Sequence, residues 1–335
     1  MKCAKRYRAV AALAMAIAVG SVGATSAAAS TITVGSVLPE KPTSVEFGQV
    51  QTFFNAALPE KGVNLTSPVD GAIVRWRVLG AEGGPFFLRV LHATGTSAYS
   101  ASGTSNPATP SSAELQTFPA NLPVKAGDLI GIDPSHATDK IGVAEVAGAS
   151  FGKIFPPPFD GATVPASGIF EGKEVELSAE VQPTPAIDAL APDFGPVAGG
   201  TEVKITGTDF STASAVKFGE TPAAGFTVDS DTQITATAPK SAAVGSVDVT
   251  VTTVAGTSQV GKADRFYYEG CQVPKLKGKR LKAAKKALYR ADCKLGKVQR
   301  RPVSNGKRRH KVVEQGPKPG KVLASGSKVR VVIGR

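Results

Sequence analysis

Apolar residues in this chain recur in short alternating runs, and glycine or proline interrupts almost every run. The 335 residues include 36 Gly and 24 Pro, residue types that end helices and favour turns. Alternation of apolar and polar residues over about four to eight positions is typical of half-buried β-strands. We therefore expect a mainly β protein, and the length suggests two or three domains rather than one.

The first residues have the layout of a secretory signal peptide. Four basic residues between Lys2 and Arg8 precede an almost wholly apolar stretch, 9–24, and small residues follow with a cleavage site near Ala29. The apolar stretch is short for a membrane span, and no later segment approaches the ~20 apolar residues that a span needs. We expect 1–29 to be removed and the mature chain, without a transmembrane segment, to be secreted, extracellular or associated with the cell envelope. An uncleaved anchor or a buried helix is the alternative.

Charge is divided sharply along the chain. From Cys271 onward there are 21 Lys and Arg against only Asp292 and Glu314, whereas residues 30–270 hold 14 basic and 25 acidic residues. The formal net charge of +12 therefore reflects one C-terminal segment and not the chain as a whole. A segment this basic raises the local concentration of anionic partners.

Two cysteines remain after the signal peptide, Cys271 and Cys293, and both lie in the basic segment. An even number of cysteines in an exported chain favours a disulfide, which would restrict the unfolded chain by roughly 3 kcal/mol. Two free buried thiols are the alternative. Two cysteines and the nearby His310 do not make a metal-ligand set.

Residues 31–180 are expected to form a β-sandwich domain of jelly-roll type, whose function the sequence does not reveal. Within 71–79, alternation places Val74, Trp76 and Val78 on one apolar face, as in a half-buried strand. The opposite face would carry Ile73, Arg75, Arg77 and Leu79. Further strands are expected in 85–91, 122–132 and 174–181. The alternate prolines of 181–185 then predict an extended linker.

The next segment, 186–268, carries several short motifs at regular spacing. They are Ile187-Asp-Ala-Leu-Ala-Pro192, Gly195-Pro-Val-Ala-Gly-Gly-Thr201, Val203-Lys-Ile-Thr-Gly-Thr-Asp-Phe210, Gln233-Ile-Thr-Ala-Thr-Ala-Pro239 and Gly245-Ser-Val-Asp-Val-Thr-Val-Thr252. This segment resembles the IPT/TIG family of immunoglobulin-like domains. The resemblance implies an Ig-like sandwich that serves as a spacer or as an interaction module for a protein partner. Alternation at Val203 and Ile205, and at Val247, Val249 and Val251, independently predicts half-buried strands.

The last segment, 271–335, carries a different set of motifs. It has a Val-Pro-x-Leu-x-Gly opening at 273–278, an Ala-rich stretch at 281–288, a Gln-x-Pro-x-Pro-Gly turn at 315–320 and a closing Val-x-Val run at 329–331. This pattern resembles a PASTA domain, a small α+β module in which a paired-cysteine variant is familiar, and it implies binding of bacterial wall material. Leu281, Ala284 and Leu288 share one face of the expected helix.

Clustered cations in this segment are the candidate residues for binding an anion or wall polymer. They are Lys275, Lys277, Lys279, Arg280, Lys282, Lys285, Lys286, Arg290, Lys307, Arg308, Arg309 and Lys311. The expected partner is peptidoglycan or another anionic cell-wall polymer; a solvated, solubilising surface is the alternative. Nucleic acid could also attract these cations, but export and the presence of only one aromatic residue, Tyr289, argue against it.

Signals for catalysis are weak. The three histidines stand in separate contexts at His92, His136 and His310. Ser135 and Asp139 lie near His136, but a catalytic triad is defined by spatial geometry and not by proximity in one loop, so we expect a solvated loop. Asp128 and Asp133 flank an apolar strand and could help to hold Ca²⁺, although ordinary turn residues are the simpler interpretation. We predict no catalytic residue, metal or cofactor.

These observations predict a non-catalytic secreted protein of the cell envelope, bound to wall polymer through its basic C-terminal module. The alternative is an extracellular carbohydrate-binding or adhesin-type protein whose ligand site lies on the first sandwich. An aromatic platform would favour that alternative, yet the only tryptophan, Trp76, has the strand pattern of a core residue.

Overall fold

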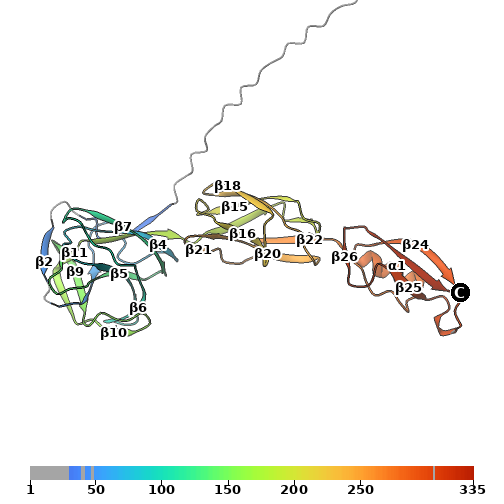
Figure 1. The fold of residues 1–335 in the computed structure, drawn as a ribbon, viewed down its shortest axis with the longest axis horizontal. Helices are drawn as coiled ribbons and strands as arrows, with labels where there is room; N and C mark the ends of the chain where they lie inside the picture. Colours follow the sequence, from blue (N-terminus) through green and yellow to red (C-terminus); the bar gives the residue numbers. More distant parts are fainter. Residues whose placement is uncertain (1–29, 39–41, 47–48, 305) are drawn as a thin grey trace, which may run out of the picture.

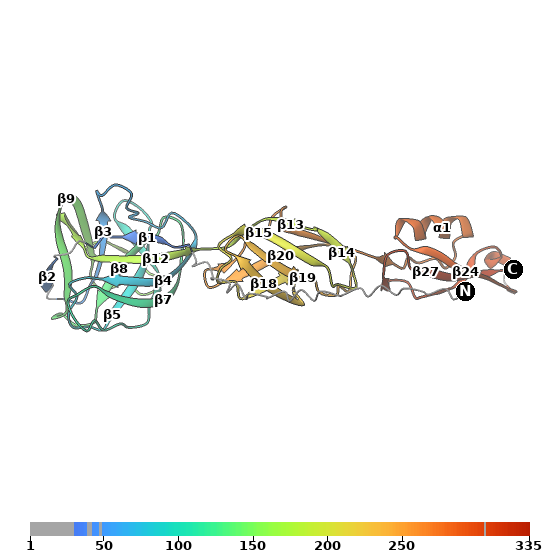
Figure 2. The same cartoon turned by 90° about the horizontal axis from the view of Figure 1, so that it is seen from above.

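The computed structural model describes residues 30–38, 42–46, 49–304 and 306–335. Three β-rich parts follow one another along the long axis of the molecule, and the last of them carries the α-helix (Figure 1, Figure 2). The fold is mainly β, as the sequence predicts. The expected signal peptide, 1–29, lies outside the described residues. No helix in the described part of the chain is long and apolar enough to cross a membrane.

Two sheets form the N-terminal sandwich. The smaller has the order β1 (Ile32–Gly35), β12 (Leu177–Pro183), β4 (Gly71–Val78), β7 (Gln116–Val124). The larger has the order β10 (Thr163–Pro165), β6 (Ala98–Thr104), β5 (Phe86–Ala93), β8 (Leu129–Pro134), β3 (Thr52–Ala57), β9 (Lys140–Ile154), β11 (Gly168–Val175), and β2 (Thr43–Glu46) pairs with β9. The chain passes repeatedly between the sheets, and Phe53, Trp76 and Ile132 are fully buried in the core that they share.

The predicted alternation in β4 is wrong at its N-terminal half. Ile73 is fully buried beside Trp76 and Val78 in the core, whereas Val74 is only half-buried. The pairing of β4 with both neighbouring strands is irregular between Ile73 and Arg75, and against β12 it leaves Val74 as the extra residue of a β-bulge. A bulge inserts one residue and so reverses the inward–outward phase on one side of it.

The second part is a sandwich of two smaller sheets. One has the order β13 (Ala186–Ala191), β15 (Glu202–Thr208), β19 (Gln233–Thr237), β18 (Gly225–Ser230). The other has the order β14 (Phe194–Pro196), β22 (Arg265–Glu269), β20 (Gly245–Thr253), β16 (Ala215–Phe218), β17 (Thr221–Pro222), with β21 (Gly256–Thr257) on β20. Val203, Ile205, Val249 and Val251 are fully buried between the sheets, as their alternation predicts; Val247 is half-buried.

The segment predicted as a linker is mostly strand. Val181 is fully buried in the first core, and 181–183 complete β12 on β4. Only Thr184 and Pro185 separate β12 from β13. The first two parts also touch, because Gln182 Nε2 donates a 2.7 Å hydrogen bond to Thr212 Oγ1. The alternate prolines do favour an extended backbone, but this backbone pairs with β4 and so belongs to the first sandwich and not to a free linker.

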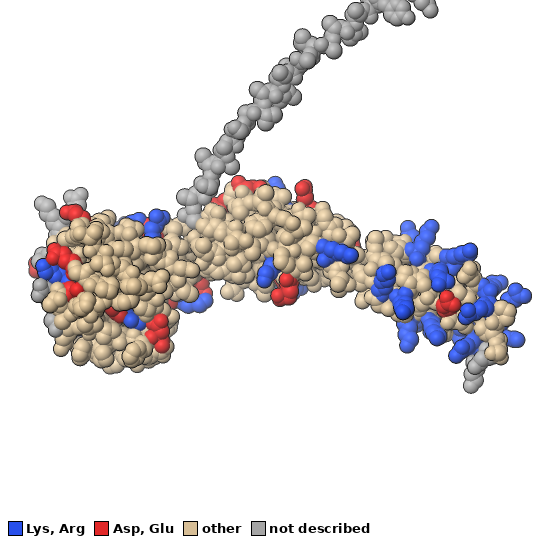
Figure 3. Space-filling model, in the orientation of Figure 1, with Lys and Arg blue, Asp and Glu red and all other residues tan. Residues whose placement is uncertain are grey.

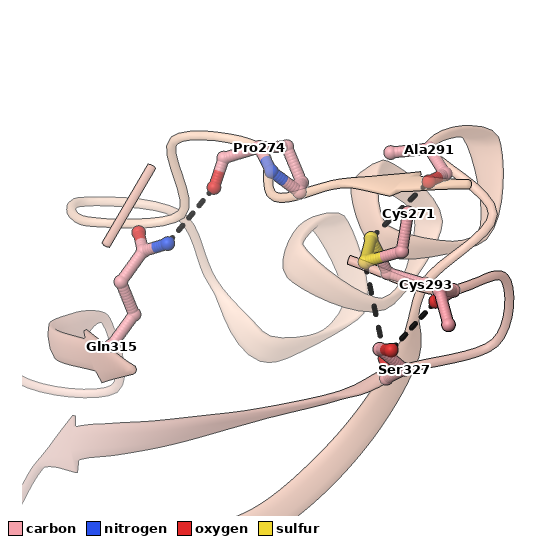
Figure 4. The surroundings of a disulfide bond; sticks show 7 residues. Cys271, Pro274, Ala291, Cys293, Gln315 and Ser327 are labelled. Carbon is pink, nitrogen blue, oxygen red and sulfur yellow. Dashed lines mark hydrogen bonds between the residues drawn. A yellow bond between two sulfur atoms is a disulfide. The ribbon is translucent and has the colours of Figure 1, made fainter. Parts of the chain in front are cut away.

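The C-terminal part packs one helix on a small sheet. Its elements are β23 (Cys271–Gln272), α1 (Leu281–Arg290), β24 (Lys294–Arg301), the 3-10 turn η1 (Gly306–Arg308), β25 (Val312–Gly316), β26 (Val322–Leu323) and β27 (Lys328–Gly334), with sheet order β24-β27-β25. Ala284 and Leu288 of α1 are buried and Leu281 packs on the same core, which confirms the predicted helix face. A disulfide joins Cys271 to Cys293 (Figure 4), as predicted.

Candidate functional site: the basic hollow of the C-terminal module

Two basic clusters that are distant in sequence meet in the C-terminal module. The backbone N–H of Gly278 donates to Val312 O at 2.8 Å, and the N–H of Val312 donates to Lys279 O at 2.9 Å. These bonds place the loop before α1 beside the residues that follow η1. Lys277, Arg308 and Lys311, together with Gly278, Val312 and Val313, line a hollow of about 230 Å³ between the two segments.

The first wall of the basic hollow is fixed by one glutamine. Gln315 Oε1 accepts a 2.7 Å hydrogen bond from the N–H of Leu276, and Gln315 Nε2 donates a 2.9 Å bond to Pro274 O. The second of these bonds is drawn in Figure 4. Leu276 is fully buried in the core of the module. These two hydrogen bonds and the buried Leu276 fix the loop that carries Lys277, although this loop is neither helix nor strand.

The second wall is tied to the end of β27. The N–H of His310 donates to Gly334 O at 2.8 Å, and the N–H of Gly334 donates to Lys311 O at 2.9 Å. Arg309 forms a parallel bridge with Gly334. The backbone that carries Arg308 and Lys311 is thus anchored to Gly334.

The remaining candidate cations do not line the hollow. Lys282, Lys285, Lys286 and Arg290 are exposed on α1, on the side opposite its buried residues. Lys275, Lys279, Arg280 and Arg309 are also exposed, in the loops. The side chain of Lys307 lies outside the described residues. The structure thus brings together three of the twelve predicted residues and places the others around them.

Very little negative charge compensates these cations. Glu314 lies 3.5 Å from Arg301 and 3.3 Å from Arg330, neither of which is a candidate residue. Among the described side chains, none of the candidate cations makes an ion pair with a carboxylate. Blue cationic side chains accordingly cover the C-terminal module in Figure 3, whereas both charges are mixed over the rest of the molecule. The hollow is open to an external anion.

Comparison with known protein families assigns the two C-terminal parts. The model of the IPT/TIG domain matches residues 185–268, and the model of the PASTA domain matches residues 272–335. The chain carries a TIG domain followed by a PASTA domain. The basic hollow lies wholly within the PASTA domain. Both families are non-catalytic.

Comparison with solved structures adds no functional argument. The plexin A4 extracellular region, domains 1 to 8, is 19% identical and matches 65% of this chain and 18% of its own, with a TM-score of 0.25. A gamma-CGTase from Alkalophilic bacillus clarkii is 16% identical and matches 64% of this chain and 25% of its own, with a TM-score of 0.23. The chain thus spans a quarter or less of these proteins. No curated protein matches it.

The candidate catalytic loop ahead of the TIG domain is held by structural hydrogen bonds. Asp139 accepts 2.8 Å bonds from the N–H groups of Gly84 and His136, and Ser135 Oγ donates to Pro85 O. Ser135 therefore points to a carbonyl and not to His136. The loop is a turn stabilised by its own polar side chains, and His136 Nδ1 lies 3.5 Å from Asp139 Oδ2.

The two aspartates considered for Ca²⁺ also have other partners. Asp133 is buried and accepts hydrogen bonds from Arg89 Nε and Nη2 at 2.7 and 2.5 Å. Asp128 accepts a 2.8 Å bond from the N–H of Lys125 and lies 2.8 Å from His92 Nδ1. The described residues contain no group of three or more His, Cys, Asp or Glu side chains arranged to hold a metal ion.

The role of Gln315 in the PASTA domain was missed by the sequence analysis. Its signal was present, because Gln315 begins the Gln-x-Pro-x-Pro-Gly turn, and a glutamine amide can both donate and accept. The pairing of its two polar atoms with Pro274 and Leu276 depends on tertiary structure. Motif recognition located the residue but not its partners.

Proposed function

We propose that this chain is a protein of the cell envelope whose PASTA domain binds peptidoglycan or another anionic wall polymer through the basic hollow. The observation that carries the proposal is the convergence of Lys277, Arg308 and Lys311 on one hollow that no acidic side chain lines. PASTA domains usually bind peptidoglycan or peptides, which supports this ligand class.

Electrostatics supports a polymeric ligand in particular. The hollow offers local hydrogen-bond donors, and the exposed cations of α1 extend the positive field beyond it. A field of one sign speeds the encounter with an oppositely charged partner, and a guanidinium can bind a carboxylate or phosphate with two parallel hydrogen bonds. We expect Arg308 to orient an anionic group, and Lys277 and Lys311 to neutralise it.

The tryptophan considered for a ligand site on the first sandwich is not exposed. Trp76 is fully buried, with Phe118 packed against it at 4.8 Å between ring centroids. The only tryptophan of the chain is therefore part of the core and offers no stacking surface to a ligand. That the N-terminal sandwich is not catalytic stays a prediction.

A matched pair of triple variants tests the proposal. Lys277→Gln/Arg308→Gln/Lys311→Gln removes three charges from the hollow, and Lys282→Gln/Lys285→Gln/Lys286→Gln removes three from exposed positions on α1. Each variant of the mature chain is sedimented with purified peptidoglycan at about physiological ionic strength, where the Debye length is ≈ 8 Å. We expect the hollow variant to lose most binding and the helix variant to retain most of it.

Two outcomes would contradict the proposal in different ways. Equal loss in both variants would mean that overall charge, and not the hollow, attracts the polymer. Undiminished binding by the hollow variant would place the binding surface elsewhere in the chain. Circular dichroism of each variant serves as the folding control, because every substituted side chain is at the surface or, for Lys311, half-buried.

A further inference from the structure

The TIG and PASTA domains meet at a junction too tight for a side chain. Gly270 is buried between them, and a Cβ at this position would lie 2.8 Å from Leu323 O and 2.9 Å from both methyl groups of Val197. Val322 of the PASTA domain packs against the TIG core. The two domains are therefore in direct contact at this point of the chain.

A second hollow, of about 420 Å³, opens beside this contact. It is larger than the basic hollow, and its volume lies in the range of about 300–1,000 Å³ that small-ligand sites span. The lining comes from both domains: Val244, Tyr267 and Gly270 on one side, and Gln272, Val273, Pro274, Arg290, Ala291, Asp292 and Gly320 on the other. Hollows at domain interfaces are a common setting for ligand sites.

An aromatic surface borders this junction hollow. Tyr267 alternates along β22 with the buried Phe266 and Tyr268, so its ring faces outward, and it is 47% exposed. Phe194 of β14 is its register partner in the parallel pair and is 51% exposed. Register partners on adjacent strands lie on the same face of a sheet. Two exposed aromatic side chains thus lie next to each other on one face of the sheet, and Tyr267 of this pair lines the hollow.

The polar groups of the junction hollow carry both signs of charge. Arg290 ends helix α1, and Asp292 follows in the turn, where its backbone O accepts a 2.8 Å bond from the N–H of Gly326. In the described part of the chain, neither side chain makes an ion pair within 4.0 Å. Gln272 adds an amide. This hollow therefore has no net charge, in contrast to the rest of the PASTA domain.

This combination favours an uncharged ligand rich in hydroxyl groups. A sugar ring presents an apolar C–H face that can pack on an aromatic ring, and hydroxyls that both donate and accept hydrogen bonds. Asp292 can only accept, Arg290 can only donate, and Gln272 can do both. A phosphate or a free carboxylate would find its complement in Arg290 but would be repelled by Asp292.

We propose that the junction hollow binds a pyranose unit of a glycan chain, with Tyr267 as the stacking surface. The inference goes beyond the proposed function, because the ligand unit is uncharged and, Arg290 aside, the residues that line this hollow are not among the candidate cations. The anion would then be held in the PASTA domain and the glycan at its junction with the TIG domain. The junction hollow requires the TIG domain, since Tyr267 and Val244 belong to it.

A nuclear magnetic resonance titration of the mature chain tests the site. The probes are two uncharged oligosaccharides at millimolar concentration, tetra-N-acetylchitotetraose and cellotetraose, which separate an acetamido requirement from a plain pyranose requirement. We expect saturable shifts of the Gly270, Gln272 and Gly320 amides with at least one probe. Tyr267→Ala should weaken that binding about tenfold or more, the loss that about 1.4 kcal/mol of stacking produces. Tyr289→Ala is the matched control, because Tyr289 is 85% exposed and does not line the hollow.

Further measurements separate this inference from the proposed function. The hollow variant Lys277→Gln/Arg308→Gln/Lys311→Gln should keep the oligosaccharide shifts, and about 0.5 M salt should not reduce them, since the ligand is uncharged. No shift of the junction amides with either probe would overturn the inference. Shifts that persist unchanged in Tyr267→Ala, or that disappear equally in Tyr289→Ala, would also overturn it. None of these results depends on whether the basic hollow binds wall polymer.

Discussion

Replacing both cysteines of the PASTA domain should destabilise that domain selectively. Cys271 and Cys293 are separated by 22 positions and are both buried. In the chain-entropy treatment, closing a loop of this length removes about 11 cal/mol/K from the unfolded chain, or about 3.4 kcal/mol at 25 °C. A domain of this size has a small core and a total stability of about 5 kcal/mol. We expect Cys271→Ala/Cys293→Ala to remove most of it.

Hydrogen exchange followed by mass spectrometry measures the loss of stability of each domain in one sample. Peptides from α1 and from β25 to β27 report on the PASTA domain, and peptides from β15 and β20 report on the TIG domain. A loss of about 3 kcal/mol corresponds to exchange roughly 150-fold faster at the PASTA amides. The TIG amides should change little, because most of their protecting hydrogen bonds lie within their own sheets.

Two results would refute this reasoning about the disulfide. Unchanged exchange in α1 would mean that the sheet and helix hold the domain without the cross-link. Equal acceleration in TIG and PASTA peptides would mean that the two domains unfold as one unit, in which case the loop-closure magnitude does not apply to the PASTA domain alone.

Three further predictions concern other parts of the molecule. Burial and the neighbouring Glu174 raise the pKa of Glu176 from 4.5 to about 8. The folded sandwich therefore retains a proton that the unfolded chain releases, and its stability should fall as pH rises from about 4.5 to 8. Glu176→Gln should remove much of this fall, up to about 5 kcal/mol, in urea titrations followed by Trp76 fluorescence; an unchanged pH profile would contradict the expectation. Gln315→Ala deletes two hydrogen bonds to backbone groups and should cost about 1–3 kcal/mol, with faster hydrogen exchange at the Leu276 amide; protection equal to that of the wild type would refute it. Gly270→Ala places a methyl group within 3 Å of Leu323 O and should loosen the junction, so that nuclear spin relaxation shows the TIG and PASTA domains tumbling more independently than in the wild type.

Local patterns in the sequence predict much of this fold because they encode short-range physics. The alternation at Val203 and Ile205 predicts buried strand positions correctly, and the spacing of Ala284 and Leu288 predicts the inner face of the helix. The motifs resembling TIG and PASTA domains locate both domains within a few residues of the family matches. The two cysteines that follow the expected signal peptide predict the disulfide that the structure contains.

Features that depend on pairing between distant segments were not predictable in this way. The bulge at Val74 follows from the pairing of β4 with its neighbouring strands, and the sequence of β4 alone does not predict it. The basic hollow depends on the hydrogen bonds of Val312 with Gly278 and Lys279, which join segments more than thirty residues apart. The candidate cations could be named from the sequence, but their division into a hollow and an exposed helix could not. The sequence indicates only that Tyr267 lies in a strand. Its position in the hollow beside the PASTA domain depends on tertiary structure.

The measurement that tests the central claim most directly is co-sedimentation with purified peptidoglycan across a salt series. It compares residues 30–335 with residues 30–269, which lack the PASTA domain. We predict that only the longer chain sediments, and that it still does so at about physiological salt, where surface charges are screened beyond ≈ 8 Å. Equal sedimentation of both chains would place binding in the sandwiches. Binding that vanishes at about physiological salt would mean that the basic hollow attracts anions only nonspecifically, and it would contradict the account.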